Sequence, residues 1–128
     1  MRRRDVLSAN GPAIPSAAAA AMRFPASTAD PLASGKAKSE QRPDRTRSAV
    51  EVEDMATTGA HAVKISRGGV EIANWPVTLN VDALGFGELE LNTQDGATNV
   101  PAAIAGDLVE VLGPDSVVIL SGTLAPKQ

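Results

Sequence analysis

Residues 77–92 have the sequence VTLNVDALGFGELELN, and apolar and polar residues alternate along them on either side of a glycine-containing centre. The alternating apolar positions are Val77, Leu79, Val81, Leu89 and Leu91. A period of two is typical of strands that bury one face. The segment therefore predicts two strands, over residues 77–81 and 88–92, with a bend at residues 85–87.

The same analysis predicts four more strands in the second half of the chain. They cover residues 62–66, 70–73, 107–112 and 116–121. Gly68-Gly69 and Gly113-Pro114-Asp115 supply the turns that hairpins require. We therefore expect an all-β domain over residues 55–128, a small antiparallel barrel or sandwich of about six strands.

The first half of the chain has a different composition. Residues 1–54 contain nine Lys or Arg, seven Asp or Glu and twelve Ala, but only seven Val, Ile, Leu or Phe. Such a segment buries too little apolar surface to offset the entropy lost on ordering. We expect residues 1–54 to be a disordered N-terminal extension.

Three interpretations of this extension remain open. Residues 2–7 resemble a twin-arginine export signal, with residues 17–21 in its apolar region and a cleavage site at residues 27–29. Alternatively, translation starts at Met55 and the preceding residues are an artefact of gene assignment. The third interpretation is a plain disordered tail.

The composition argues against several classes of function. The chain has no cysteine, one histidine, 2% aromatic residues and a net charge of −3. These values argue against disulfides, a cysteine nucleophile, a Cys/His zinc site and recognition of nucleic acid. No run reaches the ~18 apolar residues of a membrane-spanning helix. We expect no cofactor, no metal and no enzymatic activity.

The residues that carry catalysis in other proteins have simpler explanations here. His61 has no carboxylate or second histidine nearby in sequence, so we expect a structural role. Glu88 and Glu90 share a strand face at a spacing that paired-carboxylate chemistry can use, but a solvated face is the usual reason for this pattern. Residues 92–99 lack the ligand spacing of a calcium loop and predict a polar turn.

Four large residues are candidate core or interface anchors: Trp75, Phe86, Val118 and Leu120. We expect Phe86 to fill the core between two flexible glycines. The apolar run over residues 117–120 predicts a strand covered on both faces. A domain of this size has a marginal core, so we expect it to associate with copies of itself or with other subunits.

The order of these elements resembles the first β-domain of the baseplate-hub proteins of contractile-tailed bacteriophages such as Mu. The resemblance covers residues 62–124 and is carried by Val63, Ile65, Gly69, Ile72, Trp75, Val77, Leu79, Val81, Phe86, Leu89, Leu91, Gly106, Asp107, Val109, Val111 and Gly122. The segment between Val81 and Phe86 is shorter than in that family.

The resemblance implies a non-catalytic virion or tail-like component that packs against neighbouring subunits, located in the virion or the bacterial cytoplasm. The alternative follows from the signal-like residues 2–7. It is an exported periplasmic β-sandwich that binds a protein or a small ligand.

Overall fold

The computed structural model describes residues 18–74, 78–98 and 100–127, and within them it is all-β, as the sequence predicts. Its elements are β1 (Ala18–Arg23), β2 (Ser34–Arg42), β3 (Arg45–Glu53), β4 (Gly59–Arg67), β5 (Val70–Asn74), β6 (Leu79–Val81), β7 (Gly87–Asn92), a short 3-10 turn (Thr93–Asp95), β8 (Leu108–Leu112), β9 (Val118–Thr123) and β10 (Ala125–Pro126). The six predicted strands correspond to β4 to β9, with ends shifted by up to three residues.

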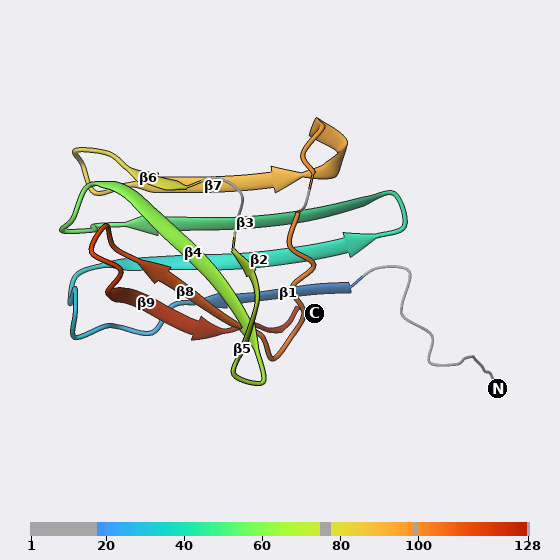
Figure 1. The fold of residues 1–128 in the computed structure, drawn as a ribbon, viewed down its shortest axis with the longest axis horizontal. Coiled ribbons are helices and arrows are strands. Elements are labelled where there is room, and N and C mark those ends of the chain that lie inside the picture. The colour runs from blue at the N-terminus through green and yellow to red at the C-terminus, as the bar shows by residue number, and fades with distance from the viewer. Residues whose placement is uncertain (1–17, 75–77, 99, 128) are drawn as a thin grey trace.

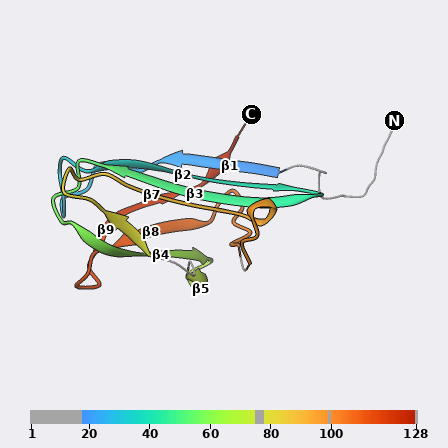
Figure 2. The ribbon, with the colours of Figure 1, turned by 90° about the horizontal axis from the view of Figure 1, so that it is seen from above.

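The strands form one antiparallel sheet in the order β10-β1-β2-β3-β7-β6-β4-β8-β9, with β5 paired to β4. The sheet folds over so that β1, β2, β3 and β7 form one layer and β4, β8 and β9 lie in the other (Figure 2). The two ends of this order, β9 and β10, are separated in sequence by Leu124 alone. Leu124 is buried, and its backbone bonds to Gly106 and Asp107. The chain therefore nearly closes the sheet into a barrel.

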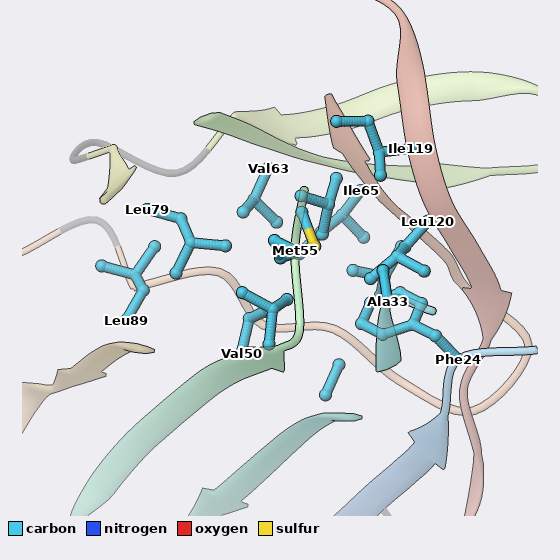
Figure 3. Close-up of a cluster of buried hydrophobic side chains, with 14 of the residues drawn as sticks. Phe24, Ala33, Val50, Met55, Val63, Ile65, Leu79, Leu89, Ile119 and Leu120 are labelled. Carbon is cyan, nitrogen blue, oxygen red and sulfur yellow. The ribbon is translucent and has the colours of Figure 1, made fainter. Parts of the chain in front are cut away.

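The core lies between the two layers (Figure 3). The inner face of β1 and β2 contributes small residues such as Ala20 and Ala37, whereas β4, β8 and β9 contribute larger ones such as Ile65, Val111 and Leu120. Small residues on one layer leave room for branched side chains on the other, and such size complementarity lets two layers interdigitate.

The expectation that residues 1–54 do not fold is wrong for residues 18–53. These residues form β1, β2 and β3, and β3 pairs with β7 over six residues. The domain boundary expected after residue 54 therefore falls inside one sheet. Residues 1–17, which carry the signal-like motif, lie outside the described residues.

β2 was missed by sequence analysis because the residues that this strand points into the core are small. Gly35, Ala37 and Ser39 are buried, while the residues between them are charged. A count of large apolar residues does not detect such a strand, although its alternation has the strand period. A chain that began at Met55 would lack β1, β2 and β3, and cleavage after Ala29 would remove β1.

Candidate functional site

The four predicted anchor residues separate in the structure. Leu120 is completely buried in the core. Phe86 and Val118 are 40% and 38% exposed. Trp75 lies outside the described residues. The prediction that residues 117–120 are covered on both faces is right for Ile119 and Leu120, which are consecutive and both buried, and wrong for Val117 and Val118, which are exposed.

The expectation that Phe86 fills the core is wrong because its neighbour occupies the inward position. A Cβ on Gly87 would lie 2.9 Å from the Asn80 carbonyl oxygen, so only glycine fits there. Since successive residues of a strand point to opposite faces, Phe86 points outward. Gly85 is restricted as well, because it has φ +83° and a Cβ there would lie 2.8 Å from the Met55 carbonyl oxygen.

Four loops meet at one end of the barrel, at the left in Figure 1. We call this surface the loop end, and it consists of residues 24–33, 54–58, 82–86 and 113–117. Each of three loops exposes at least one large apolar side chain. These are Leu32 (82% exposed), Leu84 (87%), Phe86 and Val117 (52%). Exposed apolar side chains gathered in one region are typical of interaction sites.

Hydrogen bonds connect these loops to one another. Asp30 is buried, and its Oδ2 accepts a bond of 2.8 Å from the Ala56 backbone N–H. The Met55 N–H donates to the Gly85 carbonyl over 3.0 Å. Three of the four loops are thus joined directly. A hollow of about 310 Å³ lies between the first, second and fourth loops, beside Thr57.

The turn that carries Leu84 and Phe86 is held by one carboxylate. Asp82 Oδ1 accepts bonds from the Leu84 and Phe86 N–H groups at 2.9 and 3.0 Å. Backbone bonds between Asp82 and Gly85, and between Asp82 and Phe86, close the same turn. The apolar tip is therefore presented by an ordered turn and loses little conformational entropy on binding.

The charges of the loop end have one sign. Its four loops contain four aspartates, Asp30, Asp54, Asp82 and Asp115, and no lysine, arginine or histidine. Asp30 is buried, and the other three are exposed. The loop end is thus an apolar surface with an acidic rim.

A second surface lies on the outward face of β1, β2, β3 and β7. It contains a hollow of about 500 Å³, which we call the outward hollow. One row across the sheet there runs Ala21, Lys38, Ala49, Glu90. The two alanines are short among long side chains, so they leave the space above them open.

The outward hollow is lined by five basic and three acidic residues. Two of the basic residues are neutralised locally. Lys36 Nζ lies 3.5 Å from Glu51 Oε1, and Arg47 Nε lies 3.1 Å from Glu90 Oε2. The hydrogen bond with Glu90 raises the pKa of Arg47.

The other three basic residues are Arg23, Lys38 and Lys127. None of them forms an ion pair with a residue in the described part of the chain. Glu88, the third acidic residue of the lining, also forms no ion pair in that part of the chain, so five basic and three acidic residues give the outward hollow a net charge of +2 on a protein whose net charge is −3.

The carboxylates singled out in the sequence lie on an exposed sheet face. Glu88 and Glu90 are exposed on the outward side of β7. Glu90 is engaged by Arg47 through two hydrogen bonds, and Glu88 lies opposite Glu51 in the register. Asp82 does not extend this face, because it caps the turn before β7.

His61 lies inside β4, which begins at Gly59, although the strand predicted from sequence began only at residue 62. It is almost completely buried, with Nδ1 2.9 Å from the Gly59 carbonyl oxygen. Its Nε2 has no hydrogen-bond partner among the described residues. A ring enclosed in this way has no access to a solvent-side substrate.

One ion pair was not foreseen from sequence, and it joins the buried Asp107 to Arg67, whose side chain is 47% exposed. Asp107 Oδ1 and Oδ2 accept bonds of 2.8 Å from Arg67 Nε and Nη2, and Oδ2 also accepts the Ile104 N–H at 2.9 Å. The Arg67 hydrogen bonds lower the pKa of Asp107 against the opposing effect of burial. The pair joins the last residue of β4 to the residue that precedes β8.

The polar segment after β7 forms a short 3-10 turn. Asn92 caps it by accepting the Gln94 N–H, and Asn99 lies outside the described residues. In the described ranges no three His, Cys, Asp or Glu residues cluster as metal ligands. The same ranges contain no helix of the length and apolarity needed to cross a membrane.

Comparisons with known proteins place the chain in no family. No protein-family model matches the sequence. A search of curated proteins found no match either.

Proposed function

We propose that the chain is a non-catalytic structural subunit that works by packing against other protein subunits. The observation that carries this proposal is the loop end, where Leu32, Leu84, Phe86 and Val117 are exposed on loops tied by hydrogen bonds. Exposure of four large apolar side chains to water does not stabilise the chain itself. Covering them with another subunit would bury them favourably.

The resemblance to the baseplate-hub domain suggests a phage or tail-like virion component as the assembly. The apolar residues that carry the resemblance in β4, β6 and β8, such as Val63, Val81 and Val109, face the core. This agreement supports a shared strand pattern. The resemblance does not include β1 to β3, which complete the sheet here.

The alternative is an exported β domain that binds a protein or small ligand, and the outward hollow favours it by offering a binding volume of about 500 Å³. Cleavage after Ala29 would, however, remove β1, which pairs with both β2 and β10. Cell fractionation tests this alternative. Finding the full-length chain only in the cytoplasm would exclude it.

Sedimentation velocity of the full chain tests the structural role. We expect concentration-dependent association that the double variant Leu84→Ser, Val117→Ser weakens at least tenfold. The matched control is Val70→Ser, which removes an exposed valine from β5 and leaves the loop end intact. A chain that stays monomeric alone, and also when mixed with the products of neighbouring genes, would overturn the proposed function.

A further inference from the structure

We propose that copies of this chain associate end to face, with the loop end of one copy seated on the outward hollow of the next. This inference rests on the proposed structural role and specifies the partner and the two surfaces. It follows from the charges, the exposed side chains and the shapes of two surfaces that lie on different parts of the barrel.

The charges of the two surfaces are complementary. The loop end exposes Asp54, Asp82 and Asp115 without any basic residue. The outward hollow holds Arg23, Lys38 and Lys127 without acidic partners among the described residues. Opposite potentials on two surfaces guide association and fix the orientation of the partners.

The apolar parts match as well. Leu84 is 87% exposed at the tip of its turn, and Phe86 is beside it. The outward hollow has a floor that includes Ala21 and Ala49, and its volume of about 500 Å³ is within the ~300–1,000 Å³ range in which proteins seat small ligands. Contact between Leu84 and the alanine floor would bury apolar surface at the centre, with the charged residues around it.

The two surfaces are different, so the contact is heterologous. A contact of this kind leaves one loop end and one hollow free after each addition. It therefore produces a ring if the rotation closes, or a filament if it does not. A simple two-fold dimer is not expected from it.

The test uses two full-length variants, each of which disables one surface. Leu84→Lys places a positive charge on the loop end, and Lys38→Glu reverses the charge of the outward hollow. Each variant alone should lose association at least tenfold in sedimentation velocity. Mixed in equal amounts, they should form a heterodimer, because the mixed pair retains one unaltered loop end and one unaltered hollow.

Two controls carry the same substitutions elsewhere: Val70→Lys on β5 and Lys64→Glu on β4. Both should associate like the unaltered chain, and thermal unfolding of every variant checks that it is folded. Association of the unaltered chain should also weaken at least tenfold between ~0.01 M and ~1 M salt, where the Debye length falls from about 30 Å to about 3 Å.

Several results would overturn the inference. If the chain associates but both surface variants associate equally well, the contact uses other surfaces and the structural role remains. If each variant is monomeric and mixing restores nothing, the interface is not end to face. If the chain is monomeric alone but binds neighbouring gene products, the structural role stands without this contact. If it is monomeric and binds inorganic phosphate in a way that Lys38→Glu abolishes, the hollow is an anion site.

Discussion

Asp107 links several parts of the barrel through hydrogen bonds of its side chain and its backbone. Its carboxylate is buried and receives two hydrogen bonds from Arg67 and one from the Ile104 backbone. Its backbone also bonds to Leu124, the residue between β9 and β10. This one residue thus connects β4, the loop before β8 and, through its backbone, the residue between β9 and β10.

The lowered pKa of Asp107 predicts how stability depends on pH. A carboxyl group whose pKa is depressed on folding stabilises the protein above its unfolded pKa, about 3.9, and this contribution is lost as the pH falls through the lower folded value. Arg67→Gln should lower the free energy of unfolding at pH 7, because it removes two charge-assisted hydrogen bonds that hold the Asp107 carboxylate. The loss should shrink toward pH 3.

Urea unfolding at pH 7 and pH 3 measures this effect. Lys64→Gln is the matched control, because Lys64 pairs with Glu71 on the surface and such pairs contribute about 0–1 kcal/mol. An equal loss for Arg67→Gln at both pH values would mean that the charge of Asp107 is not its source.

At the scale of elements, sequence could predict β4 to β9 but not β1 to β3. In β4, β6, β7 and β8 most inward residues are Val, Ile and Leu, which make the alternation of apolar and polar residues visible in the sequence. In β2 they are Gly35, Ala37 and Ser39. The sequence feature that could have indicated β2 is the charged residue at every second position, Lys36, Lys38 and Glu40. Such alternation is typical of the solvent-exposed face of a strand.

Neither candidate surface could be predicted from sequence. The loop end combines four loops that are up to about ninety residues apart in the chain, and only the sheet order brings them together. The outward hollow needs the register that places Ala21 and Ala49 on either side of Lys38. The sequence prediction placed Phe86 in the core. That Gly87 takes the inward position, where a Cβ would clash with the Asn80 carbonyl oxygen, can be seen only in the structure.

The turn between β6 and β7 provides a second prediction. Gly85→Ala should cost about 1–3 kcal/mol more than Gly96→Ala, the usual cost of forced overpacking. Both glycines have similar positive φ values, +83° and +88°, but a Cβ at Gly96 meets nothing within 4 Å, whereas at Gly85 it meets the Met55 backbone. Urea unfolding of the two variants gives the difference. Equal losses would show that the contact with Met55 is not restrictive.

At the scale of the whole molecule, the three N-terminal strands belong to the same cooperative unit as the rest. We expect a fragment of residues 55–128 to lack a cooperative thermal transition, because it loses β1 to β3 together with core residues such as Phe24, Val50 and Val52. A fragment of residues 18–128 should unfold cooperatively. Far-UV circular dichroism on heating distinguishes the two. A sharp transition in the short fragment at the same midpoint would contradict this expectation.

The adjacency of β1 to β10 has a consequence for synthesis. Ala20 and Ala21 pair with Pro126 and Ala125, and the Ala19 carbonyl accepts the Lys127 N–H. Because translation is vectorial, the outer edge of β1 has no partner until β10 has been translated. The nascent chain therefore emerges from the ribosome with an open sheet edge, and β10 covers that edge once it has been synthesised.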